Sequence, residues 1–345
     1  AGPLLRVTLL RLADDEHVLV LVQHHIVSDG WSMQVMVDEL VQLYAANSQG
    51  QTPQLPELPL QYADYAHWQR QWMAAGERER QLAYWRQLLG GEQPMLELPT
   101  ARARPAVQSY RGASLQLELP EALALGLNAL AQREGVTLFM VLLASFQSLL
   151  YRYSGQQDIR IGVPVANRNR VEVERLVGFF VNTQVLKADI DGQMTVGQLL
   201  QQVKLRSLDA QSHQDLPFEQ LVEALQPERS LSHNPLFQVM FNHQSEAGLM
   251  RSGQSLPDLR VEGLDWGSQT AQFDLSLDTQ ASAEGIHATL TYATDLFEPD
   301  VLKRMLAHWQ NLLQGMLNDP QQRVGQLPLL DPSEQQLLVA VSYTH

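Results

Sequence analysis

Two adjacent histidines, followed by an aspartate and a glycine, form the segment of this chain whose residue types best suit proton transfer: the string HHIVSDG, residues 24–30. Imidazole is the side chain that titrates near neutral pH without help from its surroundings, so His24 or His25 could act as an acid–base group. A metal site needs three or four ligands that converge, and one histidine with Asp29 falls short of that number. A core histidine beside a turn-forming Ser-Asp-Gly is the competing interpretation, and residue types alone leave both open.

The segments on either side would position these groups. Apolar runs at Val7–Leu12 and Val18–Val22 predict two strands buried on both faces. From residue 33 to residue 44 the apolar residues recur at helical spacing, and Ser32 is placed to cap that helix. If the histidine pair continues the strand, its two side chains point to opposite faces, so only one can serve a given site.

The rest of the chain predicts strands mixed with helices, which indicates an α/β protein with two lobes. Helices are expected at Tyr62–Met73, Glu79–Leu89, Glu121–Glu134, Thr137–Arg152, Thr195–Ser212, Pro217–Leu225 and Val301–Leu317. Strands are expected at Ser114–Leu119, Asp158–Val163, Phe179–Ile190, Leu236–Asn242, Phe273–Thr279 and Ile286–Tyr292. The proline-bearing stretch at 92–108 is the best candidate for the join between the lobes.

Composition excludes several classes of function. The formal net charge is −14, which makes nucleic acid an unsuitable partner. The chain has no cysteine, so disulfides, thiolate metal sites and cysteine nucleophiles are excluded. No apolar run approaches the roughly 20 residues of a membrane span, so we expect no membrane partner. The absence of cysteine fits a cytoplasmic location, which we expect. The first residues have no signal-peptide pattern and read as the middle of a longer chain.

The string HHIVSDGWS resembles the HHxxxDG active-site motif of the condensation domains of nonribosomal peptide synthetases. Four further segments are similar to later motifs of that family in order and approximate spacing: YADYAHW at 62–68, VGFFVNTQ at 177–184, HQDLPFE at 213–219 and RSLSHNPL at 229–236. The string LPLLDPSEQQLL resembles the linker that leads toward an adenylation domain. Two motifs that precede HHxxxDG in the family are missing, so we expect a truncated domain.

This resemblance implies a fold of two chloramphenicol-acetyltransferase-like lobes in a V-shaped pseudo-dimer, with the first lobe incomplete. The lobes would span residues 1–104 and 105–330, and residues 331–345 would begin the linker. The terminal VSYTH does not match the family linker.

The resemblance also implies an acyltransferase that forms amide bonds between substrates carried on 4'-phosphopantetheine arms, with no dissociable cofactor. The expected partners are upstream and downstream peptidyl carrier domains and an adjacent adenylation domain.

Roles for individual residues follow from the same resemblance. His25 would be the general base or the hydrogen-bond acceptor for the attacking amine, and Asp29 a structural partner of Arg168. His24, Gly30 and Trp31 complete the active-site motif. The candidates for lining a substrate channel are Asn182, Thr183, His213 and Asn234. Backbone N–H groups near Gly30 could stabilise an oxyanion.

Sequence also separates some relatives and leaves others open. A heterocyclising relative would carry aspartate in place of His24, and the string FNHQSEAG at 241–248 differs from the motif of a pure epimerising relative. The strings GFFVNTQVLKAD and PLFQVMFNHQ resemble the corresponding segments of domains that accept a D-configured donor, including domains of the dual epimerising and condensing type. A catalytically incompetent fragment that docks carriers also stays open.

Arginines are expected to form a basic patch that binds the carrier's phosphate, despite the acidic net charge. The candidates for that patch are Arg102, Arg104, Arg111, Arg168 and Arg170.

Overall fold

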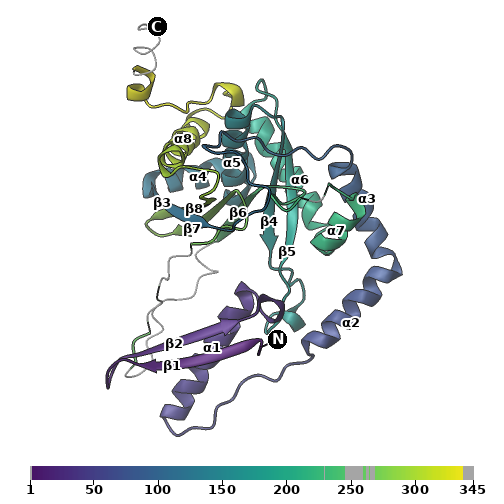
Figure 1. The fold of residues 1–345 in the computed structure, drawn as a ribbon, viewed down its shortest axis with the longest axis vertical. Helices are drawn as coiled ribbons and strands as arrows, with labels where there is room; N and C mark the ends of the chain where they lie inside the picture. The colour runs from purple at the N-terminus through teal and green to yellow at the C-terminus, as the bar shows by residue number, and fades with distance from the viewer. Residues whose placement is uncertain (1, 229, 245–258, 262–263, 265–268, 337–345) are drawn as a thin grey trace. The chain divides into compact units, whose positions relative to one another are not determined.

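The computed structural model of the chain describes residues 2–228, 230–244, 259–261, 264 and 269–336 (Figure 1). They form two compact units. The first contains the described residues within 1–80, 165–182 and 250–264, and the second contains those within 81–164, 183–249 and 265–345. The first unit is therefore assembled from separate stretches of the chain, one of which is inserted between two strands of the second unit.

The first unit begins with a hairpin of β1 (Leu5–Arg11) and β2 (His17–Gln23). The strands are antiparallel, with Leu5 opposite Gln23 and Arg11 opposite His17. A 3-10 turn, η1 (His25–Val27), then leads into helix α1 (Gly30–Ser48). The expected order of strand, strand and helix is confirmed.

The expectation that β1 and β2 are buried on both faces is wrong. All seven residues of β1 are exposed, and Leu9 has 65% of its surface accessible. In the described structure these strands form a two-stranded sheet of their own. An apolar run predicts a strand well, but its burial depends on which layers pack against it.

Helix α2 (Tyr62–Trp72) and the π-helical turn η2 (Met73–Glu77) follow in the first unit. Helix α3 (Arg78–Leu89) comes next, and its residues from 81 onward belong to the second unit. We expected two helices separated at Gly76. Gly76 has φ of 114°, a left-handed conformation that residues with a Cβ rarely adopt, and it lies within the turn between the two helices. The first unit is completed by the stretch at 165–182, which includes the 3-10 turn η3 (Val171–Val173).

The second unit is built on a six-stranded sheet in the order β3-β8-β7-β6-β4-β5. Its strands are β3 (Gly112–Pro120), β4 (Asp158–Val165), β5 (Asn182–Asp189), β6 (Val239–Gln244), β7 (Leu275–Ser282) and β8 (Gly285–Ala293). Strand β6 runs parallel to β4 and β7, whereas β8 is antiparallel to β3 and β7. The expected hairpin of β7 and β8 is confirmed.

Helices pack on this sheet and bury the main core. They are α4 (Glu121–Glu134), α5 (Leu138–Ser154), α6 (Val196–Gln211), α7 (Phe218–Leu225) and α8 (Pro299–Asn318), with the short 3-10 turn η5 (Val324–Gln326) after them. Helix α5 carries an unbroken run of buried residues from Met140 to Leu150. The mixed α/β class expected from the sequence is confirmed.

The proline-bearing stretch at 92–108, which we expected to join the lobes, lies in the second unit. The backbone N–H of Leu96 donates to the side chain of Gln238 at 2.7 Å, and that of Ala101 to the carbonyl of Leu296 at 2.8 Å. The stretch is therefore tied to the second unit along its length. The lobe boundaries at 104 and 330 and the V-shaped arrangement of lobes stay predictions.

Parts of some sequence-based predictions lie outside the described residues. They are Arg229 in the string RSLSHNPL, the last four residues of FNHQSEAG, and residues 337–345 of the expected linker with the terminal VSYTH. Within the described residues, no single helix is long and apolar enough to span a membrane. Helices α4 and α5 pass that test of length and composition only together, as a pair bent by 102°.

Candidate active site

The expected active-site motif lies in the first unit, between β2 and α1. The strand ends at Gln23, and His24 is the N-cap of the turn η1. Asp29 is the N-cap of α1, and its Oδ1 accepts the backbone N–H of Ser32 at 2.8 Å. Ser32 is therefore not the cap that we expected, because aspartate three residues earlier takes that position.

His25 is exposed, and one of its ring nitrogens is already used. Its Nδ1 lies 2.6 Å from the carbonyl oxygen of Ser28. A carbonyl can only accept, so Nδ1 carries the proton and donates it. In the neutral ring Nε2 then carries the lone pair. The ring also makes an edge-to-face contact with Phe179, with centroids 5.1 Å apart and planes at 88°. His25 therefore offers a hydrogen-bond acceptor with a fixed tautomer.

His24 has a different task. Its Nδ1 accepts the backbone N–H of Ile26 at 3.1 Å, and its own backbone N–H donates to the carbonyl of Leu4 at 2.8 Å. The neutral ring must then carry its proton on Nε2, the opposite tautomer to His25. The expectation that the histidine pair continues the strand is wrong, since β2 ends at Gln23, before His24. The separation of the two rings arises from the turn.

Asp29 and Arg168 form a buried ion pair inside the first unit. Arg168 Nη2 lies 3.1 Å from Asp29 Oδ1, and the two side chains are 1% and 3% exposed. The other carboxylate oxygen of Asp29 accepts the backbone N–H groups of Phe180 at 2.9 Å and Val181 at 3.2 Å. Arg168 Nη1 donates to the carbonyls of Val173 and Leu176, both at 2.7 Å. The pair therefore fixes the 165–182 stretch from two sides.

Ser32 is a residue of this cluster whose role the sequence did not reveal. Its hydroxyl is fully buried, donates to the carbonyl of Gly178 at 2.8 Å, and accepts from the N–H of Gly178 at 3.0 Å and from Arg168 Nη2 at 2.7 Å. The signal for a cap was present, but a partner 146 residues away leaves no local pattern.

The electrostatics of the pair follow from burial opposed by hydrogen bonds. Burial alone would raise the pKa of the Asp29 carboxyl, but the N–H groups of Ser32 and Phe180 and the Arg168 cation hold this pKa below its usual value. Burial lowers the pKa of Arg168, and Asp29 opposes that shift. The Arg168 guanidinium also lies 4.1 Å from the ring centroid of Phe180, which favours the cation.

Phe179 and Tyr62 were not among the site residues expected from the sequence, although both lie in segments that resemble motifs of the family. The hydroxyl of Tyr62 donates to the carbonyl of Phe179 at 2.7 Å. Burial raises the pKa of this phenol, so it remains a neutral donor at neutral pH. Tyr62 and Tyr65 pack with Phe180 in a small apolar cluster of the first unit.

The remaining motif residues are also in the first unit. Trp31 is half exposed, and its Nε1 donates to the carbonyl of Glu174 at 2.8 Å, a further bond to the 165–182 stretch. Gly30 is exposed at the start of α1. Asn182 is the last residue of the 165–182 stretch. The geometry does not test whether these three residues take part in catalysis, so their roles stay predictions.

The other channel candidates, Thr183, His213 and Asn234, belong to the second unit. The ring of His213 stacks on Tyr84, with centroids 4.2 Å apart, and its Nδ1 donates to the carbonyl of Asp209 at 2.7 Å. Asn234 accepts the N–H of Leu236 at 3.4 Å. These are local contacts, and the channel stays a prediction.

The arginines expected to form a basic patch are already engaged. Three of them pair with carboxylates of the second unit: Arg102 with Glu298, Arg104 with Asp274, and Arg111 with Asp295. The guanidinium of Arg170 lies over the Trp68 ring in the first unit. These arginines therefore do not form a cluster of unpaired cations, and the structure gives the patch no support.

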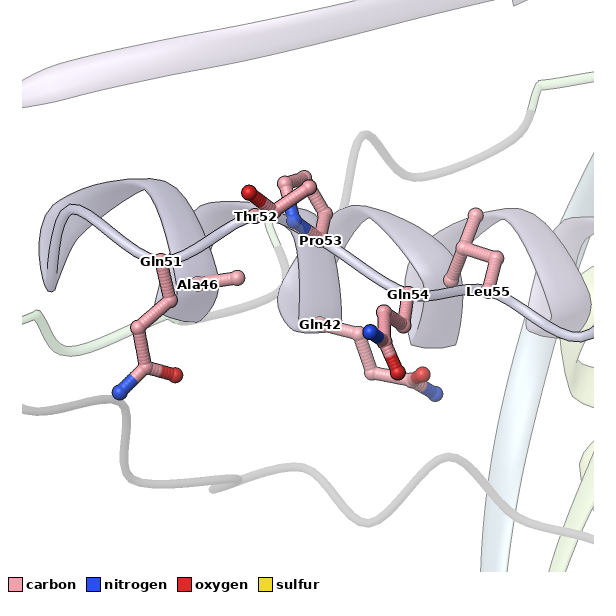
Figure 2. A pocket seen from close by; sticks show the side chains of 7 residues that line it. All are labelled: Gln42, Ala46, Gln51, Thr52, Pro53, Gln54 and Leu55. Atoms are coloured by element: carbon pink, nitrogen blue, oxygen red, sulfur yellow. The ribbon is translucent and has the colours of Figure 1, made fainter.

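A pocket lies at the far end of α1 from Asp29, against the extended segment that follows the helix (Figure 2). It is lined by Gln42, Ala46, Gln51, Thr52, Pro53, Gln54 and Leu55. None of these side chains titrates, so this pocket has no group for proton transfer. Among the described residues there is also no group of three histidine or acidic side chains that could hold a metal ion.

Comparisons with known proteins agree with the geometry. Residues 1–339 match the family model of the condensation domain. The chain is 50% identical to one of the proteins that make up the linear gramicidin synthase of Brevibacillus parabrevis, over 335 residues, which are 96% of this chain and 4% of that protein. It is 40% identical to tyrocidine synthase 3 of the same organism, over 96% of this chain and 5% of that protein. The chain thus spans a small part of these relatives.

Solved structures show the same fold. The X-domain from teicoplanin biosynthesis matches with a TM-score of 0.87 and 28% identity, over 95% of this chain and 75% of that one. A four-domain nonribosomal peptide synthetase bound to AMP and glycine matches with a TM-score of 0.84 and 25% identity, over 97% of this chain and 26% of that one. The buried Asp29–Arg168 pair, the exposed His25 and these matches lead to one conclusion: the chain belongs to the condensation-domain family.

Proposed function

We propose that this chain forms a peptide bond between an acyl or peptidyl thioester on an upstream carrier domain and the amine of an aminoacyl group on a downstream carrier domain. The observation that carries the proposal is the state of His25: an exposed imidazole whose Nδ1–H is committed to Ser28, which leaves Nε2 as an acceptor. The membership in the condensation-domain family supports it. Both substrates would arrive on 4'-phosphopantetheine arms, and an adenylation domain would be a neighbour.

The reaction is an acyl transfer to nitrogen. The amine nitrogen attacks the thioester carbonyl, the new C–N bond forms, and the C–S bond breaks. One amine proton passes to His25 Nε2 or is held by it, and the leaving sulfur takes up a proton as the free thiol. A positioned acceptor for that proton contributes roughly 10²–10⁴-fold to a rate. Holding both tethered reactants close together lowers the barrier further.

Asp29 and Arg168 would support this chemistry without touching substrate. They tie the start of α1 to the 165–182 stretch, and the His25 turn lies directly before that helix. Backbone N–H groups near Gly30, at the positive end of α1, are the proposed stabilisers of the tetrahedral oxyanion. Asn182, Thr183, His213 and Asn234 remain proposed channel residues.

The test is condensation between purified carriers loaded with D- or L-phenylalanine as donor and L-leucine as acceptor. His25→Ala should lower the rate by about 10²–10⁴-fold with the fold retained. His17→Ala, at an exposed histidine in β2, is the matched control and should leave the rate unchanged. Full activity in His25→Ala would remove that residue from the mechanism.

The same assay tests the subtype through a comparison of the rates with D-phenylalanine and with L-phenylalanine as donor. We propose a D-configured donor, from the strings at 178–189 and 235–244. Preference for D-phenylalanine supports that assignment. Conversion of carrier-bound L-phenylalanine to its D form before condensation would indicate the dual epimerising type. A cytoplasmic location belongs to the same proposal.

A binding role is the second candidate function. The X-domain that matches this chain has been solved as a complex with OxyB, with 29% identity to this chain and a TM-score of 0.85. A chain that only docks partners would bind loaded carriers without joining their cargo. Carrier binding without product in the wild-type protein would favour this function over condensation.

A further inference from the structure

Phe179 is an apolar side chain held at the surface beside His25. The residue is 36% exposed, and its ring makes the edge-to-face contact with the imidazole described above. The hydrogen bond from His25 Nδ1 to Ser28 holds one side of that imidazole ring. The perpendicular contact with the Phe179 ring supports the same orientation from a second side, because aromatic pairs prefer this geometry.

The backbone around Phe179 is held on each side. Its own carbonyl accepts from Tyr62, the preceding Gly178 exchanges two hydrogen bonds with the Ser32 hydroxyl, and the following residue, Phe180, donates to Asp29. Three consecutive residues are therefore anchored to α1 and α2. The Phe179 ring projects from this fixed backbone, so it can serve as a rigid wall for His25.

Gly178 gives independent evidence that this arrangement is tightly specified. A Cβ at that position would lie 2.3 Å from Cδ2 of Tyr62, which is closer than real Cβ contacts come. The Tyr62 ring thus lies against the bare backbone of Gly178 while its hydroxyl reaches the next carbonyl. The glycine allows the tyrosine to approach, and the tyrosine fixes the peptide that carries Phe179.

We propose that Phe179 is a positioning residue for His25: its ring fixes the plane of the imidazole, so that Nε2 has one direction in which to meet the acceptor amine. This inference rests on the proposed function, because it assigns His25 to the reaction. Phe179 acts through His25 and need not contact the reacting atoms. Loss of the Phe179 ring should therefore change kcat and the tautomer of the His25 imidazole more than it changes the KM for the acceptor carrier.

The experiment compares Phe179→Leu, Phe179→Tyr and Val177→Ala in the full chain. Leucine keeps the bulk and removes the ring, tyrosine keeps the ring, and Val177 is a partly exposed residue two positions earlier in the same stretch. Two readouts are used. One is the nitrogen NMR spectrum of histidine-labelled protein, which distinguishes imidazole tautomers, and the other is kcat and KM with the D-phenylalanyl and L-leucyl carriers.

In the wild type and in Phe179→Tyr, His25 should show the single Nδ1–H tautomer and similar kcat values. Phe179→Leu should lower kcat by about 10-fold, the scale of losing one aromatic contact at a reacting group, with KM within twofold. An imidazole without the Phe179 ring beside it would turn away from the Ser28 carbonyl part of the time, so its tautomer signal should be mixed. Val177→Ala should match the wild type. Thermal unfolding of each variant identifies any loss of folded protein.

A Phe179→Leu variant with wild-type kcat and an unchanged His25 spectrum would overturn the inference. A rise in KM alone would also overturn it, because it would make Phe179 a substrate contact. Failure of Phe179→Tyr to retain activity would show that the ring contact is not the cause. The proposed function fails by a different result, full activity in His25→Ala, and the tautomer measurement does not depend on that outcome.

Discussion

The carboxylate of Asp29 and the guanidinium of Arg168 meet at 3.1 Å inside the first unit, although 139 positions separate them in the sequence. The carboxylate also caps α1 and accepts two backbone N–H groups of the 165–182 stretch. One side chain therefore holds the start of the helix, the inserted stretch and the buried cation. The position of the His25 turn relative to Phe179 depends on this pair, because the turn precedes the helix directly.

Removing either partner should weaken the structure strongly. Asp29→Ala should destabilise the protein by about 3–5 kcal/mol, because an unpaired charge is left buried. Arg168→Ala should have a similar effect, and the double variant should lose much less than the sum of the two. Chemical unfolding of the three variants gives the free energies.

The matched control for that experiment is Asp14→Ala. Asp14 pairs with Arg11 in an exposed turn, and such pairs contribute about 0.2–1 kcal/mol or less. Equal unfolding midpoints for Asp29→Ala and the wild type would contradict a structural role for the buried pair.

The same carboxylate should make stability depend on pH in the acid range. Hydrogen bonds and Arg168 hold the pKa of Asp29 below its usual value when the protein is folded. The unfolded chain would have a pKa of about 3.9 for this group. The stabilisation is therefore fully present above about pH 4 and is lost as the pH falls through the folded-state pKa.

Asp29→Asn removes this titrating group. The difference in unfolding free energy between the wild type and Asp29→Asn should shrink as the pH is lowered from 6 to 2, as measured by urea unfolding. A difference that stays constant over this range would show that Asp29 does not titrate with a lowered pKa.

Ser32→Ala should loosen the 165–182 stretch. The change removes the hydroxyl that bonds Gly178 twice and Arg168 once, and leaves those groups without their partner in a buried site. We expect a loss of about 1–3 kcal/mol. Hydrogen exchange should become faster at the amides of Gly178 and Phe180.

Ser48→Ala is the control for Ser32. Its hydroxyl bonds the carbonyl of Ala45 at the exposed end of the same helix, so stability and exchange should be unchanged. Unchanged exchange at Gly178 in Ser32→Ala would mean that the hydroxyl does not hold the stretch.

Local patterns predicted the elements well. Helix α4 has the expected bounds, Glu121–Glu134, because its apolar spacing and flanking residues mark both ends. The match of HHIVSDG to a family motif located the site, and the ion pair of Asp29 with Arg168 that we expected from the resemblance is present.

Features that depend on contacts distant in sequence were not predictable. Ser32 looked like a cap, and its bonds to Gly178 could not be read from residues near it. The burial of β1 was overestimated, since an apolar run does not show which layer covers it. The tautomer of His25 depends on where the chain turns after Gln23, which sequence periodicity places only to within a few residues.

His24 should prove replaceable where His25 is not. Its Nδ1 caps the turn η1 by accepting the N–H of Ile26. Asparagine offers an acceptor at a similar position, so His24→Asn should retain stability and condensation activity, whereas His24→Ala should lose about 1 kcal/mol. Thermal unfolding and the carrier assay measure both. A loss of activity in His24→Asn as large as that in His25→Ala would assign chemistry to both rings.

Gly178→Ala should destabilise the protein through a clash with Tyr62. The added Cβ would lie 2.3 Å from Cδ2 of that ring, and the ring cannot swing away without breaking the hydrogen bond from its hydroxyl to Phe179. Overpacking of this kind costs about 1–3 kcal/mol. Because Tyr62→Ala removes the obstacle, adding Gly178→Ala to it should cost little.

The unfolding free energies of the two single variants and the double variant measure this coupling. Gly30→Ala is the control, since a Cβ at Gly30 meets no atom within 4 Å and should change stability little. Additive losses at Gly178 and Tyr62 would contradict the clash. Tyr62 fixes the carbonyl of Phe179, and the Phe179 ring packs against the His25 imidazole. Losses that are not additive, together with a weaker contact between Phe179 and His25 in Gly178→Ala, would therefore connect the glycine to the imidazole.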